Sequence, residues 1–536
     1  MLTPAQQQAV AADGNVLVMA GAGTGKTRTL VERCVHRVMS GACSLDEILM
    51  VTFTEAAAAE MRQRIRTRLE EESARAPENE RLAEQIALLD LAHISTLHSF
   101  CLRLVREHFY ELEIDPQVAV LDESEARLLA EETLNVLLDD AYAGTDEFSV
   151  ATQNLIQEQG RGWDKPIGEL VLKLFHFTQT QPNPQGWLRE QLAAFEQFEP
   201  GQWRRWFDEA LIDWRAEWLP VLRAQPNENG NAHRCAVEVE KISAEMPRAE
   251  VAAVLNEILN LDRAWPKNKK GTLRGPIEKL FDEAGFLHAL VVAPAPPLAG
   301  DQSAKENSPT DPLAEDWNWA RGPMATLVRL VQEFGRRFAL AKRELGALDF
   351  HDLEQFALRL LREEATGAQT ALAWQWRQKL RFVFVDEYQD INAAQDAILT
   401  ALGRDGTEAN RFLVGDVKQS IYRFRLADPR IFQSYARAWS EPASGALVIP
   451  LTDNFRSHEA ILCFVNSLFA LLMRADAGGV NYDDAARLHF GNASERQSLR
   501  SAPDTPPRVE LHARMKAGRG VEASPDEDAP ADVVVE

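Results

Sequence analysis

The stretch that decides the fold covers residues 16–27 and reads VLVMAGAGTGKT. Four apolar residues come first, and a glycine-rich loop that ends in Gly-Lys-Thr follows them. A helical pattern comes next, with apolar residues at Leu30, Val31, Cys34, Val35 and Val38. A strand, a glycine-rich loop and a helix in this order are typical of a phosphate-binding site. A glycine turn without a ligand is the alternative, and the flanking strand and helix argue against it.

The residue types in this loop match the chemistry of a triphosphate. Glycines let backbone N–H groups surround a phosphate at a helix N-terminus. The strict pattern has glycine where this chain has Ala20, but its Gly-Lys-Thr ending is intact. Lys26 is expected to neutralise the β- and γ-phosphate oxygens, and the Thr27 hydroxyl to ligate Mg²⁺. The residues expected to bind ATP here are Ala20, Gly21, Ala22, Gly23, Thr24, Gly25, Lys26, Thr27 and Arg28.

Similar apolar runs occur at residues 48–51, 382–385 and 412–414. Continuous apolar runs, as opposed to alternating ones, suit parallel strands that are covered on both faces. Ligands of such sheets bind at the carboxyl ends of the strands. The sequence therefore predicts an α/β fold with a parallel sheet.

Two acidic residues, Asp386 and Glu387, follow the run 382–385 directly. Asp386 suits the Mg²⁺ shell, and Glu387 suits orienting or deprotonating an attacking water. Acidic residues after strands are common, so the pair alone is a weak indication of a nucleotide site. Together with the phosphate loop it becomes a strong one. The long sequence between the two is no obstacle, because insertions between strands are well tolerated.

Bulk properties constrain the class of protein. Lys and Arg total 58 against 81 Asp and Glu, which gives a net charge of −23 and counts against a nucleic-acid binder. Charge screening over roughly 8 Å nevertheless lets an acidic protein carry a local basic track. The five cysteines are scattered, which predicts free buried thiols. No apolar run is long enough for a membrane span and no signal peptide is evident, so we expect a cytoplasmic protein.

Residues 115–339 are rich in helical patterns but carry no recognisable chemistry, which predicts a helical insertion. Its tryptophans are interpreted as core residues; they are Trp187, Trp203, Trp206, Trp214 and Trp218. A proline-rich stretch predicts an exposed loop and contains Pro294, Pro296, Pro297, Pro309 and Pro312. Near the end, residues 508–511 look like a strand after Pro503, Pro506 and Pro507, and 512–536 like a disordered or truncated tail.

Sequence boxes in a fixed order extend the interpretation. They are LTPAQ at 2–6, VTFTE at 51–55 with AAEM at 58–61, STLHSF at 95–100, LDFHDL at 348–353, DEYQD at 386–390, GDVKQSIYRFR at 415–425 and NFRS at 454–457. Together they resemble the UvrD/RecB-type superfamily 1 DNA helicases. The box at 415–425 is most similar to the AddA form, and the box at 348–353 resembles the RecB/AddA branch.

The resemblance implies a RecA-like P-loop NTPase sheet with a large helical insertion and the start of a second RecA-like domain. The implied domains are 1–114 with 340–438 for the first, 115–339 for the insertion, and 439–511 for the second. It also implies that Gln6 reads adenine, that Phe455 stacks on it, and that Gln419 senses the γ-phosphate. Arg456 would contact the γ-phosphate from the second domain. The implied catalytic set is Lys26, Glu387, Gln419 and Arg456.

Four residues are expected to contact DNA: Phe53, His98, Tyr422 and Phe424. Tyr422 and Phe424 would face one way on an extended segment and stack on unpaired bases. Each expectation has an alternative: the aromatic residues could be core, His98 could be structural, and Gln6 could be a surface residue. Arg423 and Arg425 could be solvated and not touch phosphate.

The function implied by the resemblance is ATP-driven movement, 3′ to 5′ on single-stranded DNA with duplex ends, in double-strand-break repair and recombination. The resemblance also implies a partner of the AddB kind. Two departures stand against it: Ala57 replaces a lysine common in the family, and no motif V, motif VI or nuclease segment is found. The alternative is a truncated ATP- and DNA-binding protein without turnover, because an arginine supplied by motif VI is worth roughly 10³–10⁵ in rate in related enzymes.

Overall fold

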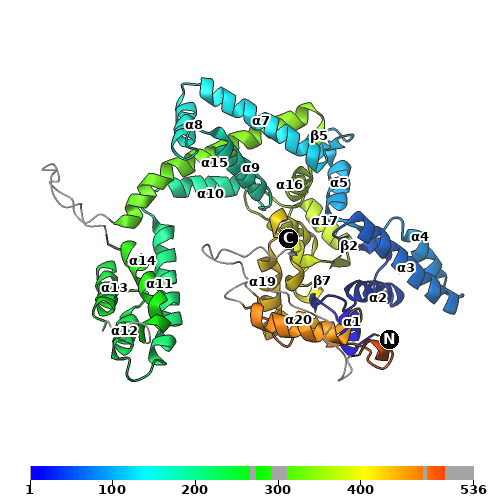
Figure 1. The fold of residues 1–536 in the computed structure, drawn as a ribbon. Coiled ribbons are helices and arrows are strands. Elements are labelled where there is room, and N and C mark those ends of the chain that lie inside the picture. The colour runs from blue at the N-terminus through cyan, green and yellow to red at the C-terminus, as the bar shows by residue number, and fades with distance from the viewer. Residues whose placement is uncertain (1, 266–272, 293–310, 475–479, 501–536) are drawn as a thin grey trace, which may run out of the picture. The chain divides into compact units, whose positions relative to one another are not determined.

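The computed structural model describes residues 2–265, 273–292, 311–474 and 480–500, and its elements are labelled in Figure 1. The chain divides into two compact units. The sheet unit comprises the described parts of Met1–Phe100, Gln369–Asn392 and Leu399–Glu536. The helical unit comprises those of Cys101–Ala368 and Ala393–Ile398.

The centre of the sheet unit is a six-stranded sheet in the order β3-β2-β6-β7-β1-β8. Every pairing in it is parallel. The strands are β1 (Val16–Ala20), β2 (Ile48–Thr52), β3 (His93–Thr96), β6 (Phe382–Val385), β7 (Arg411–Gly415) and β8 (Leu447–Leu451). The four predicted strands are β1, β2, β6 and β7, so the prediction of a parallel sheet is confirmed.

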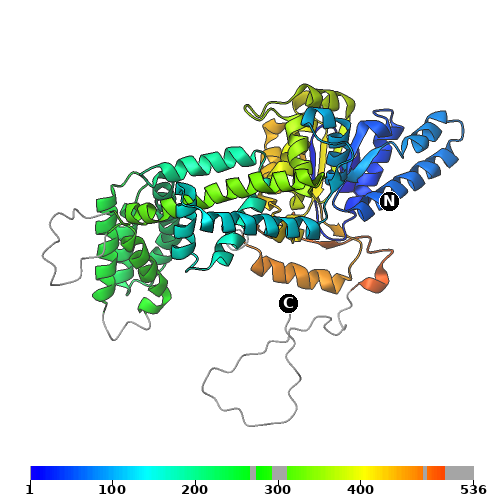
Figure 2. The same ribbon diagram turned by 90° about the horizontal axis from the view of Figure 1, so that it is seen from above.

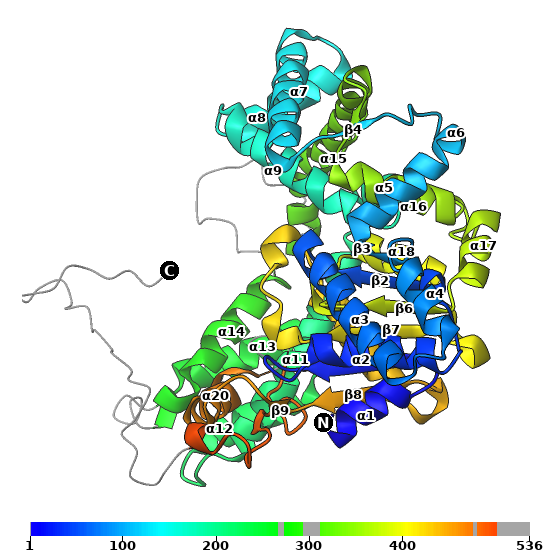
Figure 3. The same ribbon diagram turned by 90° about the vertical axis from the view of Figure 1, so that its right-hand side faces the viewer.

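Strands β1, β2, β6 and β7 are mostly apolar because both faces of the sheet are covered there. Val16 and Val18 of β1 pack in one core with α2 and α3, and the intervening Leu17 is buried as well. Figure 3 shows α2 and α3 on one face of the sheet. The predicted apolar side of α2 is confirmed, because its five residues are all buried: Leu30, Val31, Cys34, Val35 and Val38.

The other elements of the sheet unit are mostly helices. They are α1 (Pro4–Ala11), α2 (Lys26–Met39), α3 (Glu55–Arg75), α4 (Glu80–Leu88), α17 (Ala371–Lys379), α19 (Pro429–Ser440) and α20 (Glu459–Leu472). Two short strands, β9 (Asp453–Asn454) and β10 (His489–Phe490), pair in parallel. Helices α5 (Leu97–Glu107) and α18 (Ala393–Leu402) contain residues of both units.

The helical unit has two apolar cores that share the long helix α15 (Pro312–Glu344). One core joins α15 to α7 (Glu123–Ala143), α8 (Glu147–Glu158), α9 (Asp164–Gln179) and α10 (Pro184–Glu196). The other joins its first turn to α11 (Gly201–Arg223), α12 (Gly230–Lys241), α13 (Arg248–Arg263) and α14 (Glu278–Ala289). The unit also contains α6 (Phe109–Leu112), α16 (Phe350–Leu361), and the parallel pair β4 (Ala119–Val120) and β5 (Ala347–Leu348). Figures 1 and 2 show α15 in yellow-green between the two helix groups.

Several sequence expectations need correction. Strand β8 pairs with β1 in the first sheet, so the predicted boundary at 439 does not separate two sheets. The helical unit is wider than 115–339. Pro312 begins α15 and is not part of a loop, because proline suits the first turn of a helix. The remaining named prolines and residues 508–536 lie outside the described residues.

Side-chain burial bears out part of the remaining expectations. Trp214 and Trp218 are core residues, whereas Trp206 is exposed. Four cysteines are buried, but Cys463 is exposed on α20. No helix in the described part of the chain is long and apolar enough to cross a membrane.

Candidate nucleotide and nucleic-acid site

The predicted site residues gather at one edge of the sheet. All six strands are parallel, so their carboxyl ends meet at the same edge, where ligands of such sheets bind. Just past this edge lie Gly21 after β1, Phe53 after β2, His98 in the first turn of α5 after β3, Asp386 after β6, Asp416 after β7 and Asn454 in β9 after β8. The topology therefore brings together motifs that are far apart in the sequence.

The loop after β1 has the backbone shape of an anion cradle. Gly23 and Gly25 have φ angles of +72° and +86°, in the left-handed region that favours glycine. The Thr24 hydroxyl donates to the Gly21 carbonyl at 2.8 Å and closes the turn. Lys26 then begins α2, so the loop ends at a helix N-terminus.

Gln6 is part of this loop's support. Its side chain is 2% exposed, and its Nε2 donates to the Thr24 carbonyl at 3.0 Å. Its Oε1 accepts from the Thr3 backbone N–H, and the Thr3 hydroxyl in turn accepts from the Gln6 N–H. This capping box fixes the start of α1. The alternative that Gln6 is a surface residue is therefore wrong.

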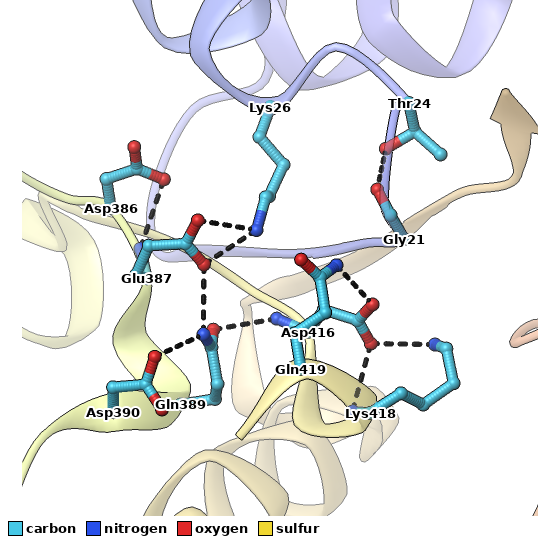
Figure 4. Close-up of polar contacts among 10 residues, drawn as sticks. All are labelled: Gly21, Thr24, Lys26, Asp386, Glu387, Gln389, Asp390, Asp416, Lys418 and Gln419. Atoms are coloured by element: carbon cyan, nitrogen blue, oxygen red, sulfur yellow. Dashed lines mark hydrogen bonds and ion pairs between the residues drawn. The ribbon is translucent and has the colours of Figure 1, made fainter. Parts of the chain in front are cut away.

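Lys26 and Glu387 form the central ion pair of the site (Figure 4). The Lys26 Nζ lies 2.7 and 2.6 Å from the two carboxylate oxygens of Glu387. Glu387 has a φ of +52°, a left-handed conformation that a non-glycine residue adopts only at a cost of about 1–3 kcal/mol. The turn after β6 thus holds the carboxylate against the phosphate-loop lysine.

Asp386 lies between β2 and the ion pair. Its backbone N–H donates to the Val51 carbonyl at 2.9 Å, and its Oδ1 accepts from the Glu387 N–H at 3.0 Å. Burial, and then the neighbouring Glu387 charge, raise the pKa of Asp386 to about 6. A carboxylate oxygen here and the Thr27 hydroxyl are oxygen donors of the kind that Mg²⁺ prefers, so the donor set fits this ion.

Gln389 connects the two halves of the site, a role that the sequence did not indicate. Its side chain is 1% exposed, and its Nε2 donates to Glu387 Oε2 at 2.9 Å and to Asp390 Oδ2 at 2.8 Å. Its Oε1 accepts from the Asp416 backbone N–H at 2.8 Å. The DEYQD box marked the residue, but only the fold shows its second partner.

Gln419 lies on the far side of this connection. Its Nε2 donates to Asp416 Oδ2 at 2.7 Å, and the Lys418 Nζ lies 2.7 Å from Asp416 Oδ1. Asp416 is buried, so these bonds fix the loop that follows β7. Glu387 and Gln419 are thereby linked through the side chain of Gln389 and through Asp416 (Figure 4).

Three aromatic side chains lie together beside the site. The Phe53 and Tyr422 rings are stacked with their centroids 4.8 Å apart, and the Tyr422 and Phe424 centroids are 5.9 Å apart. Phe53 is 40% exposed and Phe424 76%, so the core alternative is wrong for both. Tyr422 is half-buried.

The segment that carries Tyr422 and Phe424 is not extended as expected. The Arg425 N–H donates to the Tyr422 carbonyl at 2.8 Å, which closes a 3₁₀ turn over Arg423–Arg425. Both arginines are exposed, and the Arg425 guanidinium lies 5.9 Å from each of the two rings. The turn still leaves the rings adjacent.

His98 lies in the first turn of α5 and is half-buried. Its neighbour Ser99 donates its hydroxyl to Glu55 Oε1 at 2.5 Å, and Thr96 does the same at 2.8 Å. These two hydroxyl groups hold the pKa of Glu55 below its usual range. Glu55, at the start of α3, thus links the segment of Phe53 to the β3–α5 junction, where His98 lies. Sequence reasoning missed this contact.

Phe455 and Arg456 lie next to the phosphate loop. The Phe455 N–H donates to the Gly23 carbonyl at 2.8 Å, and Asn454 Nδ2 donates to the Ala22 carbonyl at 2.6 Å. Arg456 was expected to act from a second domain, but it belongs to the sheet unit because it directly follows β8 and β9. Both Phe455 and Arg456 are exposed.

Comparisons with known proteins agree with this site. The UvrD/REP helicase N-terminal domain family matches residues 2–272 and 295–439. The A subunit of the ATP-dependent helicase/nuclease of Moorella thermoacetica is 36% identical over 97% of this chain and 38% of its own length. The protein of the same name from Geobacillus kaustophilus is 34% identical over 99% of this chain and 43% of its own. The chain thus spans about two fifths of the length of these relatives. It belongs to the UvrD/REP helicase family, whose N-terminal domain covers most of its residues.

Proposed function

We propose that the chain is the ATP-hydrolysing part of a DNA helicase of the AddA kind. The observation that carries the proposal is the continuous network from Lys26 through Glu387 and Gln389 to Asp416 and Gln419. The loop that begins at Asp416 also carries Tyr422 and Phe424. One loop therefore adjoins both a nucleotide site and a surface suited to unpaired bases.

In the proposed reaction, Lys26 exchanges its partner. Arrival of ATP draws its ammonium group from Glu387 to the β- and γ-phosphate oxygens. Glu387 is then free to orient the attacking water and accept its proton. Bound Mg²⁺, held by Thr27 and Asp386, would supply neutralisation of the phosphate charge.

The other nucleotide contacts are proposed from the resemblance to the helicase family. Gln6 supports the loop and reads the adenine edge, the exposed Phe455 ring stacks on the base, and the Arg456 guanidinium reaches the γ-phosphate. Gln419 senses whether that phosphate is present. We infer that the helical unit is an insertion in this ATP-binding domain.

Single-stranded DNA is the proposed second ligand. Phe53, Tyr422 and Phe424 offer ring faces to successive bases, each stacked base being worth about 1–3 kcal/mol without sequence preference. His98 lies in the first turn of α5, which follows the neighbouring strand β3. The exposed Arg423 and Arg425 place positive charge beside the rings, which answers the objection raised by the acidic net charge.

The biological setting is proposed from the names of the relatives, which describe one component of an ATP-dependent helicase/nuclease. We infer 3′ to 5′ movement on single-stranded DNA, entry at duplex ends, and action in double-strand-break repair with a partner of the AddB kind.

The test is ATP hydrolysis by the 536-residue chain with and without single-stranded DNA. Hydrolysis that DNA stimulates and that Lys26→Ala abolishes would support the motor function. Arg205→Ala, which changes an exposed arginine of the helical unit, is the control and should hydrolyse ATP normally. Binding of ATP and DNA without stimulated turnover would contradict the motor and favour a binding module.

A further inference from the structure

The segment 454–457, here called the strap, lies against the phosphate loop. Asn454 is 1% exposed although its side chain is polar, and its Nδ2 donates to the Ala22 carbonyl at 2.6 Å. The Phe455 backbone N–H donates to the next carbonyl, that of Gly23, at 2.8 Å. Two consecutive carbonyls of the phosphate loop are therefore held by the strap.

These bonds decide which way the loop's N–H groups point. A trans peptide is planar, so its carbonyl and its N–H point in opposite directions. Fixing the Ala22 carbonyl toward the strap aims the Gly23 N–H away from it. Fixing the Gly23 carbonyl does the same for the Thr24 N–H, which without nucleotide donates to the Gly21 carbonyl at 3.3 Å. Outward carbonyls and inward N–H groups are what an anion cradle requires.

The same amide group also organises the strap. Asn454 Oδ1 accepts from the backbone N–H groups of Arg456 at 2.9 Å and Ser457 at 2.7 Å. Arg496 holds the strap from its other side by donating to the Asn454 carbonyl at 2.8 Å and to the Ser457 carbonyl at 2.7 Å. An amide is the side chain that can donate to the loop and accept from the strap at once.

Close packing makes the arrangement specific. A Cβ added at Gly23 would lie 2.7 Å from Asn454 Nδ2 and 2.8 Å from Arg456 Cβ, so the strap approaches the loop as closely as glycine permits. Among the described residues, the Arg456 guanidinium has no hydrogen bond or ion pair, although its backbone is fixed by Asn454.

We propose that Asn454 is a positioning residue for the nucleotide. Its amide nitrogen shapes the phosphate loop before nucleotide arrives, and its amide oxygen fixes Arg456 beside that loop. The role of the amide oxygen rests on the proposed function, since it assumes that a triphosphate binds here. The role of the amide nitrogen concerns the phosphate loop alone and can be tested without nucleotide.

The first test is amide hydrogen exchange of the nucleotide-free chain at pH 7. Asn454→Asp keeps the acceptor for Arg456 and Ser457 but loses the donor to Ala22. Exchange at residues 21–27 should rise about 3- to 10-fold, as expected for one net hydrogen bond. Exchange in β2 should stay unchanged, which shows that the fold is intact. Asn79→Asp adds the same charge at an exposed site of the sheet unit and should have no effect on the loop.

A second variant covers the case in which Asn454→Asp also loosens β2. Arg496→Ala removes the outer support of the strap but leaves the Asn454 side chain, and it should raise loop exchange to a smaller extent. Unchanged exchange at 21–27 in a folded variant of either kind would overturn the proposal.

The second test separates the two ends of the amide by calorimetric titration with ADP and with a non-hydrolysable ATP analogue. Asn454→Asp should weaken both ligands by about 3-fold or more, because both use the loop and the added negative charge repels both. Asn454→Ala should weaken the ATP analogue further than ADP, because Arg456 loses its support. Equal, wild-type affinities in both variants would overturn the proposal. If the wild-type chain binds neither ligand, the proposed function fails, and the exchange experiment still decides the role of the strap.

Discussion

Lys26 and Glu387 are 361 residues apart in the sequence, yet the Lys26 Nζ lies 2.6 Å from a carboxylate oxygen of Glu387. The pair has two consequences. It holds the phosphate-loop lysine against the residue proposed to handle water, and it makes triphosphate binding a competition between Glu387 and phosphate for one ammonium group. Removing Glu387 should therefore affect binding and hydrolysis in opposite directions.

Glu387→Gln is expected to reduce kcat by about 10²–10⁴-fold, because the general base is lost. Its affinity for ATP should not fall and should rise a few-fold, since Lys26 no longer has a charged competitor. Lys26→Ala should instead lose affinity. Steady-state ATPase and equilibrium titration of ATP at low temperature would measure the two effects. Weakened binding by Glu387→Gln would contradict the competition.

Gln389→Ala should destabilise the sheet unit by about 1–3 kcal/mol. The variant leaves the buried Asp416 N–H without its acceptor, and an unsatisfied buried donor carries its full desolvation cost. Urea denaturation followed by fluorescence would measure the change. Gln7→Ala, which removes an exposed amide bonded to the Leu2 carbonyl, is the matched control and should leave stability nearly unchanged. Equal stability of the two variants would show that the hydrogen bond between the Gln389 side chain and the Asp416 N–H does not stabilise the fold.

Phe53→Ala and Tyr422→Ala should each weaken binding of a fluorescent single-stranded oligonucleotide by about 1–3 kcal/mol. The double variant should lose less than the sum, because the two rings stack on each other and removing one already disturbs the other. Fluorescence anisotropy at fixed salt would measure this. Tyr110→Ala serves as the control, since this ring is exposed in the helical unit. Strictly additive losses of binding free energy would indicate that the two rings contact DNA independently.

Lys342→Met should destabilise the helical unit by about 3–5 kcal/mol, since it leaves the buried Asp349 carboxylate and the half-buried Asp352 carboxylate without their cation. The Lys342 Nζ lies 2.7 Å from Asp349 Oδ2 and 2.6 Å from Asp352 Oδ2. Burial alone would raise the pKa of Asp349, but Lys342 holds it below its usual range. Without the lysine, the folded state should bind protons more tightly than the unfolded chain, so part of the lost stability should return as the pH falls from 7 to 5.

Thermal or urea unfolding at the two pH values would measure the Lys342→Met effect. Lys279→Met removes an exposed lysine that pairs with Glu283 in the same unit, and it should change stability little at either pH. If Lys342→Met lowers the free energy of unfolding equally at both pH values, the two carboxylates are not the cause.

The sequence by itself determined the local chemistry of this protein. Residues 16–39 indicate a strand, a phosphate loop and a helix through short-range patterns, and the apolar run before Asp386 indicates a second strand. These features depend on neighbours in the chain, so they could be predicted from composition and spacing. The same holds for the identity of the reactive side chains, such as Lys26 and Glu387.

Only the tertiary structure decided which distant residues meet. Strand β8 was assigned to another domain because nothing local reveals that its backbone pairs with β1. Gln389 and Asn454 stand in sequence boxes, but nothing in those boxes shows that the fold buries each beside backbone groups from a distant loop. Local patterns report the conformation of a segment, whereas hydrogen bonds between segments depend on partners that the chain brings together only when its core has packed.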